Sequence, residues 1–268
     1  FMLIRDPQGK VYALDFRERA PAGSTRTMLQ DGKGNRDADK ATIGALSVGV
    51  PGTVAGMDQA IKRFGHWDLK RVVAPARKIA ENGFHVPPWL TAEVERVRPG
   101  LSRFPDSKRI FFPDGFPLPT DSVWKQPDLA KTLTAIEIKG PAGFYEGPVA
   151  AKIARSIQMH GGVMTVQDLK NYKAVWREPV HGTYRGYDIA SMPPPSSGGV
   201  HLIQALNVLE GFPMREDGLN SAINLHRIIE TLRQCYADRS QWLGDPDFVK
   251  VPVEYLTSKD YAGKIRAQ

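Results

Sequence analysis

The sequence predicts one compact unit in which helices pack on a largely antiparallel sheet. Strand-type residues form a hairpin pattern at the start of the chain and another after residue 173, and helical periodicity fills most of the rest. There is no internal repeat and no low-complexity linker, so no boundary between independent domains is predicted. At 268 residues, with 41% hydrophobic side chains, the chain is long enough to bury a full core.

The first hairpin is expected within residues 1–18. Two runs of strand-type residues flank the turn Asp6-Pro7-Gln8-Gly9. Two strands alone are only marginally stable, so a larger sheet is expected to receive them. The next polar stretch, residues 22–40, is rich in glycine and aspartate and predicts a surface excursion.

Helices are expected through the centre of the chain because apolar residues recur there at helical spacing. Glycine stops and a Thr165-Val166-Gln167-Asp168 capping pattern mark several of their ends. Five prolines predict that residues 99–126 form an irregular connection. The expected helices cover residues 51–64, 69–83, 88–97, 128–138, 147–160 and 165–172.

The last hundred residues are expected to begin with a hairpin and to continue as helices. Strand-type residues at 180–184 and 187–192 flank the tight Arg185-Gly186 turn. Helices are expected over residues 199–210 and 221–242.

The charge balance gives no indication of a nucleic-acid partner. The chain has 36 Lys+Arg against 29 Asp+Glu, a formal charge of +7, but its basic residues never run longer than two. No nucleic-acid-binding signature accompanies them, so an ordinary solvated surface is the interpretation. A membrane span is not expected either, because the longest uncharged stretch, residues 189–209, contains three consecutive prolines and a glycine pair.

Metal and thiol chemistry are also not expected. The six histidines are scattered without helical i, i+4 pairs, so neither a metal site nor a cofactor is predicted. The single cysteine, Cys235, lies in a helical pattern with Leu225, Ile228, Ile229 and Leu232, which predicts a buried and inert thiol.

The most unusual segment is Met192-Pro193-Pro194-Pro195-Ser196-Ser197-Gly198-Gly199-Val200-His201. Two hydroxyls at the start of a helix could serve as a nucleophile or an anion site. A rigid helix entry with a serine cap, and glycines that permit close packing, explains the same residues and is favoured. No base partner can be assigned from the spacing, so Ser196 and Ser197 are not assigned to catalysis.

Arg17 is the candidate binding residue. It ends an otherwise apolar strand in Asp15-Phe16-Arg17-Glu18, where a planar guanidinium can hold a substrate carboxylate through two parallel hydrogen bonds. An internal ion pair with Asp15, Glu18 or another acid is the alternative, and the residues alone favour it. The acids and the arginine between Tyr236 and Asp247 are interpreted as a capping and salt-bridge network.

Several strings, in order along nearly the whole chain, resemble the large subunit of gamma-glutamyltransferases. They are Ala13-Leu14-Asp15-Phe16-Arg17-Glu18, Gly49-Val50-Pro51-Gly52-Thr53-Val54-Ala55-Gly56, Phe144-Tyr145-Glu146-Gly147, Gly161-Gly162 with Thr165 and Asp168-Leu169, Tyr184-Arg185-Gly186-Tyr187, Met192 to Gly199, and Tyr236-Ala237-Asp238-Arg239 with Leu243-Gly244-Asp245-Pro246-Asp247-Phe248.

This resemblance implies an α+β fold, the αββα sandwich of N-terminal nucleophile hydrolases, of which the chain supplies most of the large-subunit part. Such proteins are precursors that cut themselves into two subunits, and the new N-terminal threonine of the small subunit is the nucleophile. Its hydroxyl is expected to attack a γ-glutamyl amide such as glutathione, and the acyl group passes to water or to an amino acid or peptide. The resemblance also assigns Arg17 to the α-carboxylate of the glutamyl group.

The resemblance further implies that the chain is truncated at both ends, as a single large-subunit fragment covering residues 1–268. We therefore expect no catalytic residue within it, and we expect its own small subunit as partner. A periplasmic or extracellular location follows from family habit. Two alternatives stay open: a cephalosporin or glutaryl acylase, whose acyl group carries no α-amino acid centre and so does not require the Arg17 clamp in the same role, and a non-catalytic homologue that acts as a binding module.

Overall fold

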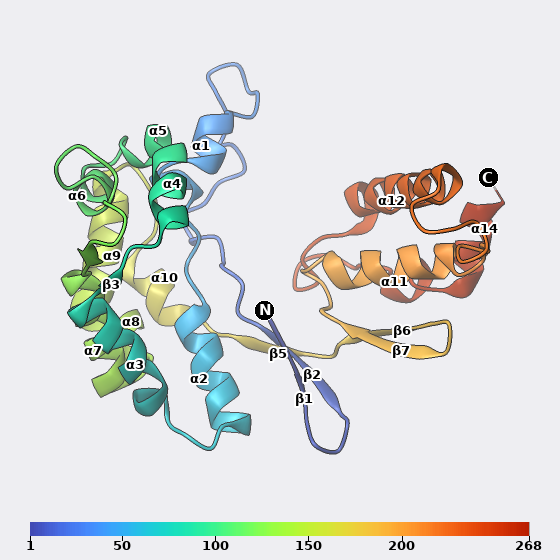
Figure 1. The fold of residues 1–268 in the computed structure, drawn as a ribbon, viewed down its shortest axis with the longest axis horizontal. Coiled ribbons are helices and arrows are strands. Elements are labelled where there is room, and N and C mark those ends of the chain that lie inside the picture. Colours follow the sequence, from blue (N-terminus) through green and yellow to red (C-terminus); the bar gives the residue numbers. More distant parts are fainter. Residues whose placement is uncertain (268) are drawn as a thin grey trace. The chain divides into compact units, whose positions relative to one another are not determined.

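The computed structural model of the chain describes residues 1–267, which divide into two compact units (Figure 1). Unit 1 combines Phe1–Asp15 with the chain from Val175 onward, and unit 2 is Phe16–Ala174. The sequence offered no boundary between them. The chain passes from one unit to the other after Asp15 and again after Ala174, and at neither point does the composition change or a linker occur. That residues 1–268 form one large-subunit fragment stays a prediction.

Unit 1 contains a three-stranded antiparallel sheet in the order β1-β2-β5. Its strands are β1 Met2–Arg5, β2 Val11–Asp15 and β5 Val175–Arg177. The predicted first hairpin is confirmed, with Met2 opposite Leu14. A further strand receives it, as expected, because Ala13 pairs with Arg177.

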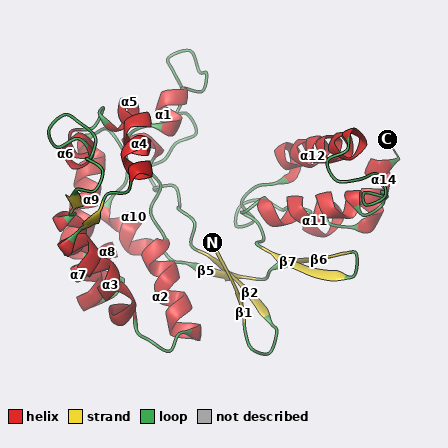
Figure 2. Cartoon of the chain, in the orientation of Figure 1, coloured by secondary structure: helices red, strands yellow, loops and turns green. Residues whose placement is uncertain are grey.

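The rest of unit 1 is a hairpin with helices on it. Strands β6 Val180–Tyr184 and β7 Tyr187–Ser191 pair as predicted, and α11 Gly198–Leu209 packs against both (Figure 2). Helix α12 Ala222–Trp242 and helix α14 Lys259–Arg266 pack on α11, and the short α13 is Val253–Leu256. The core of this part lies among Val180, Val200, Ile203 and Leu256.

Helix α12 turns a different face inward from the one that the sequence predicted. Cys235 is buried, as expected, but together with Asn224, Thr231 and Asp238. Leu225, Ile229 and Leu232 are instead exposed. The reason is that polar side chains on the inner face find hydrogen-bond partners, so the apolar pattern alone did not identify the buried side.

Unit 2 is mainly helical. The predicted central helices are confirmed, and Gly83 ends the second of them at φ 86°, where glycine is favoured. The elements are α1 Ala38–Thr42, a 3-10 turn Ala45–Ser47, α2 Thr53–Phe64, α3 Leu69–Asn82, β3 Phe84–His85, α4 Pro88–Arg96, α5 Arg98–Leu101, α6 Pro105–Phe111, β4 Val123–Trp124, α7 Pro127–Lys139, α8 Ala142–Tyr145, α9 Gly147–Met159 and α10 Val166–Asn171.

The prediction of an irregular connection over residues 99–126 is wrong in part. The segment contains the end of α5, helix α6 and strand β4, which pairs with β3. The prolines of this segment were expected to break helices. Two of them instead begin helices, because Pro99 and Pro105 lie in the first turns of α5 and α6. The missing proline N–H has no helical partner at that position.

Buried side chains from five segments of unit 2 form its core. Val50, Tyr145, Ala150, Met164, Leu169 and Tyr172 are its buried members. The predicted capping box is present at α10, where the Thr165 hydroxyl and the Asp168 carboxylate each accept a backbone N–H of the other. The fold class is α+β, as expected. Within residues 1–267, no helix combines the length and apolar character that crossing a membrane requires.

Candidate functional site

Arg17 is the second residue of unit 2. It does not end the strand as predicted, because β2 ends at Asp15, two residues earlier. Its side chain is 48% exposed, and its Nε donates a hydrogen bond to Glu18 Oε1 at 3.2 Å. Of the ion pairs that the sequence allowed, the one with Glu18 is therefore present, whereas Asp15 pairs with Arg177 at 2.8 Å. A solvent-exposed ion pair contributes little free energy, so the bond between Arg17 and Glu18 is itself a weak contact.

Hydrogen bonds from other segments hold the main chain around Arg17. The Tyr172 hydroxyl donates a hydrogen bond to the backbone carbonyl oxygen of Arg17 at 2.6 Å. Two residues on, Arg19 and Val50 exchange backbone hydrogen bonds of 3.2 and 2.7 Å. An arginine with a fixed backbone and an accessible guanidinium is preorganised for a ligand, because binding then orders only the side chain.

Glycines allow the segment 49–56 to lie against residues 16–19, which we call the Arg17 loop. A Cβ added to Gly52 would lie 2.0 Å from the Tyr172 hydroxyl and 2.1 Å from the Phe16 carbonyl oxygen. A Cβ on Gly56 would lie 2.2 Å from the Phe16 ring. Only glycine permits such approaches without displacing the neighbours. These contacts give a physical reason for the two motifs, 13–18 and 49–56, to occur together.

A stacked pair of tyrosines, Tyr145 and Tyr172, holds the Arg17 loop and the segment 49–56 through hydrogen bonds. The rings of Tyr145 and Tyr172 are 5.8 Å apart and nearly parallel. The Tyr145 hydroxyl donates to the Pro51 carbonyl oxygen at 2.8 Å and accepts from the Ala55 N–H at 3.2 Å. Burial raises the pKa of Tyr145 to about 12, so this hydroxyl stays protonated at neutral pH. Sequence reasoning did not assign either tyrosine, although the 144–147 string contained Tyr145.

The proline-serine segment of unit 1 has the architecture of a helix entry. A Cβ on Gly199 would lie 2.2 Å from the Met192 carbonyl oxygen, which confirms the expected close packing. A serine was expected to cap the helix with its side chain. Ser197 is the N-cap residue, but its side chain makes no capping hydrogen bond. Ser196 Oγ instead accepts from the Gly198 N–H at 3.2 Å, and Ser197 Oγ accepts from Arg239 Nε at 3.2 Å. A serine that accepts a bond from a cation is not activated as a nucleophile by that contact.

The acids between Tyr236 and Asp247 have structural partners, as expected, but the cation that pairs with Asp247 is Arg177, whereas Arg239 donates to Ser197. Asp238 is 4% exposed and accepts from the Tyr261 hydroxyl at 2.9 Å, from Gln234 Nε2 at 2.9 Å and from Gln204. Asp247 binds Arg177 through two hydrogen bonds of 3.0 and 3.1 Å. These carboxylates are already engaged by the protein.

Cys235 is 0% exposed, and burial followed by the nearby Asp238 charge raises the pKa of its thiol to about 12. The thiol is therefore protonated and inert at neutral pH. The described residues contain no group of three or more histidine, cysteine, aspartate or glutamate side chains placed to hold a metal ion.

The chain matches known proteins over its whole length. The gamma-glutamyltranspeptidase family model matches residues 1–268. The glutathione hydrolase proenzyme of Escherichia coli strain K12 is 46% identical over 269 residues, which are 100% of this chain and 46% of that protein. The structure of Helicobacter pylori gamma-glutamyltranspeptidase superposes with a TM-score of 0.96 at 43% identity, covering 99% of this chain and 76% of that one.

Acylases are also among the relatives. The acylase ACY 1 proenzyme of Pseudomonas sp. strain V22 is 38% identical over 270 residues, covering 98% of this chain and 48% of that protein. The chain thus spans about half the length of the curated relatives that it matches. The structural likeness confirms the expected fold class. Since one family model covers every residue and the relatives align along the entire chain, the chain belongs to the gamma-glutamyltranspeptidase family.

Proposed function

We propose that the chain is most of the large subunit of an enzyme that cleaves γ-glutamyl amide bonds, with glutathione or its conjugates as substrates. The single observation that carries this proposal is that the whole chain aligns, at 46% identity, with 46% of a glutathione hydrolase proenzyme. In the complete protein, its own small subunit is the partner. Water and amino acids or peptides are the acceptors of the glutamyl group.

In the proposed reaction, the N-terminal threonine of the small subunit attacks the γ-carbonyl carbon of the glutamyl group. The C–N bond of the amide breaks, the leaving amine takes a proton, and an ester links the glutamyl group to the threonine oxygen. Attack by water or by an acceptor amine on this ester then releases the threonine. No residue of the present chain is assigned to bond making or breaking.

Arg17 has the role of holding the α-carboxylate of the glutamyl group. Its guanidinium is accessible, its backbone is fixed by Tyr172, and its recorded partner Glu18 is itself 59% exposed. A planar guanidinium can donate two parallel hydrogen bonds to a carboxylate, which positions the substrate as well as binding it.

An acylase is the second candidate, since the acylase ACY 1 proenzyme is 38% identical over nearly the whole chain. Its identity is lower than that of the glutathione hydrolase, and an acyl group without an α-amino acid centre gives Arg17 no carboxylate of this kind to hold. The first candidate is therefore preferred.

The deciding experiment uses the product of the full-length gene. Its intact mass, N-terminal sequencing of each chain and an assay with a chromogenic γ-glutamyl anilide are measured together. Two chains, the smaller beginning with threonine, and cleavage of the anilide are expected. Processing without anilide cleavage would favour the acylase, and a single uncut and inactive chain would favour a non-catalytic homologue. Cell fractionation tests the proposed periplasmic or extracellular location.

A further inference from the structure

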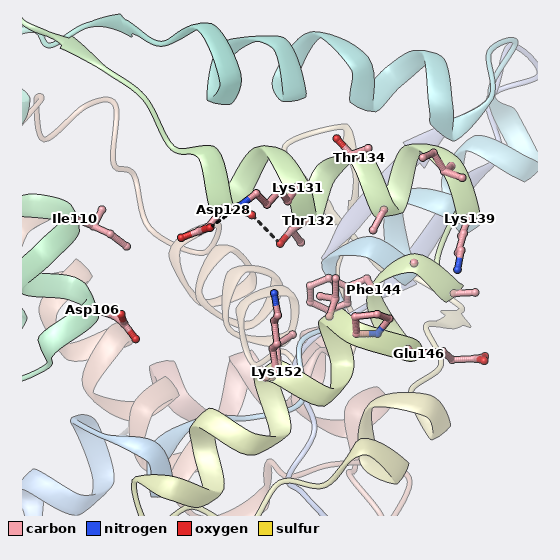
Figure 3. A pocket seen from close by; sticks show the side chains of 18 of the residues that line it. Asp106, Ile110, Asp128, Lys131, Thr132, Thr134, Lys139, Phe144, Glu146 and Lys152 are labelled. Atoms are coloured by element: carbon pink, nitrogen blue, oxygen red, sulfur yellow. Dashed lines mark hydrogen bonds and ion pairs between the residues drawn. The ribbon is translucent and has the colours of Figure 1, made fainter.

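A groove with a volume of about 1010 Å³ lies in unit 2 among helices α6, α7, α8 and α9 (Figure 3). It is distinct from the Arg17 loop and shares no lining residue with it. Apolar side chains from all four helices line it, and they include Ile110, Ile138, Phe144, Val149 and Ile153. Its size is that of pockets that bind small molecules.

A close contact between helices α7 and α8 forms one wall of the groove. A Cβ on Gly143 in α8 would lie 2.0 Å from the carbonyl oxygen of Ala135 in α7. Glycine therefore lets α8 lie directly against α7, and the next residue, Phe144, then packs against the buried core of unit 2. The groove wall is consequently anchored to the core of the unit.

Most polar groups that line the groove are already engaged. Arg109 lies 3.5 Å from Asp106 and 3.6 Å from Asp128, and Lys131 lies 3.5 Å from Asp128. The hydroxyl of Thr132 donates to the Asp128 carbonyl oxygen at 3.1 Å, which Figure 3 marks with a dashed line. Thr134 likewise donates to a backbone oxygen, that of Ala130, at 2.8 Å.

Lys152 is different. Figure 3 shows its ammonium group, carried by α9, directed into the groove between Thr132 and Phe144. No hydrogen bond or ion pair to it is recorded within residues 1–267, and Glu146 is directed away from it in this view. Lys139 also has no recorded partner there, but it is the last residue of α7, where a cation interacts favourably with the helix end.

We propose that this groove binds a small amphiphile with one anionic head and an aliphatic body, such as a medium-chain carboxylate. The carboxylate accepts a charge-assisted hydrogen bond from Lys152 Nζ. The aliphatic chain lies along Ile138, Phe144 and Ile153, where it loses contact with water. A ligand with several polar groups fits less well, because most of the other polar side chains that line the groove already have partners.

The first test is calorimetric titration of the full-length protein with decanoate and, separately, with decanol. Saturable binding of decanoate is expected, and decanol is expected to bind about tenfold or more weakly because it lacks the charged head. In Lys152→Met, decanoate affinity should fall by about tenfold or more while decanol affinity is unchanged. Lys170→Met, at an exposed lysine of α10 outside the groove, is the matched control and should bind decanoate normally.

The second test places a charge in the apolar part of the groove. Ile138 is 72% exposed and lines the groove, whereas Leu129 is 42% exposed on the same helix and does not line it. Both sites are exposed enough for a glutamate to be accepted without loss of folding, which circular dichroism verifies. Ile138→Glu should abolish decanoate binding, and Leu129→Glu should preserve it.

Three results would overturn the proposal. One is the absence of saturable decanoate binding, and another is equal affinity in the Lys152→Met and Lys170→Met proteins. The third is equal affinity in Ile138→Glu and Leu129→Glu. A lipid surface is tested separately by sedimentation with phosphatidylglycerol vesicles: binding to vesicles without binding of free decanoate would also contradict the proposed ligand.

Discussion

The Tyr172 hydroxyl holds the backbone carbonyl oxygen of Arg17 at 2.6 Å, across 155 residues of sequence. Tyr172 therefore acts on the main chain of Arg17 and leaves the guanidinium accessible. Its ring also stacks on Tyr145, so the hydroxyl cannot move without disturbing the core of unit 2. If Arg17 binds substrate as proposed, Tyr172 is expected to act as a positioning residue for it.

Arg17→Ala is expected to raise KM for γ-glutamyl substrates by roughly 100-fold or more in the complete enzyme. The loss of a charge-assisted bidentate contact costs about 1.5–3 kcal/mol, or more when the substrate carboxylate is left unpaired. Arg17→Lys should recover only part of the affinity, because an ammonium cannot reproduce the guanidinium fork. Steady-state kinetics with a γ-glutamyl anilide measure both variants, and unchanged constants in both would remove Arg17 from the site.

Tyr172→Phe is expected to raise KM by about five- to tenfold with a smaller change in kcat. The variant keeps the stacked ring but removes the hydrogen bond to the Arg17 carbonyl oxygen, and a typical intramolecular hydrogen bond contributes about 0.5–1.5 kcal/mol. Tyr187→Phe, at a 73% exposed ring, is the control and should leave both constants unchanged. If Tyr172→Phe lowers kcat and the thermal stability but leaves KM unchanged, the role of Tyr172 is purely structural.

Gly52→Ala is expected to destabilise the protein by about 1–3 kcal/mol or more, because the new methyl group collides with the Phe16 backbone and the Tyr172 hydroxyl. Gly100→Ala is the matched control. A Cβ there meets nothing within 4 Å, and an alanine in α5 should be neutral or stabilising by about 0.4–1 kcal/mol. Urea unfolding compares the two, and similar midpoints would refute the close approach at Gly52.

Arg177→Ala is expected to cost about 3–5 kcal/mol of stability. It removes the guanidinium that pairs with the carboxylate of Asp15, whose side chain is 7% exposed, and breaking a buried ion pair is costly. Arg96→Ala removes an exposed pair with Glu93 and should cost less than about 1 kcal/mol. Thermal unfolding of the two variants provides the comparison, and an Arg177→Ala protein as stable as Arg96→Ala would show that the pair is solvated.

Asp168 is expected to make the stability of unit 2 fall in acid. Burial alone would raise its pKa, but hydrogen bonds from the Ala22 N–H and from Thr165 outweigh this and lower the pKa below its ordinary 3.8. A carboxyl with a lowered folded-state pKa contributes stability above its unfolded pKa, and this contribution is lost as pH falls through the folded value.

The urea midpoint of the Asp168→Asn protein should therefore depend less on pH below about pH 4 than that of the wild type. Asp114→Asn, at an exposed loop position, serves as the control and should follow the wild-type profile. Parallel profiles for all three proteins would show that Asp168 has no role in the acid sensitivity.

Local signals in the sequence predicted most elements of the fold. The Asp6 to Gly9 turn, the capping box at Thr165 and the glycine after α3 each specify a local backbone geometry, and all three are present. Helices α5 and α6 were missed because a proline in a first helical turn and a proline in a loop look alike in sequence. The inner face of α12 was mistaken because buried polar groups depend on partners distant in sequence.

The candidate site was predicted only in part. Arg17 was proposed through its motif and stays a prediction, and its backbone partner, Tyr172, lies 155 residues away. No periodicity or spacing connects residues so far apart, and the need for glycine at Gly52 arises from atoms of two other segments. Such contacts are properties of the assembled unit and not of any local stretch.

The register of β2 and β5 places Asp15 opposite Val175, although all the residues of unit 2 separate the two along the chain. Closing a flexible loop of that length costs conformational entropy before the two strands gain their hydrogen bonds. If residues 16–174 fold first, their compact form replaces this long random loop and shortens the effective search. In that order of folding the three-stranded sheet forms late, and damage to the helical insertion is expected to slow its formation without altering a single residue of the sheet.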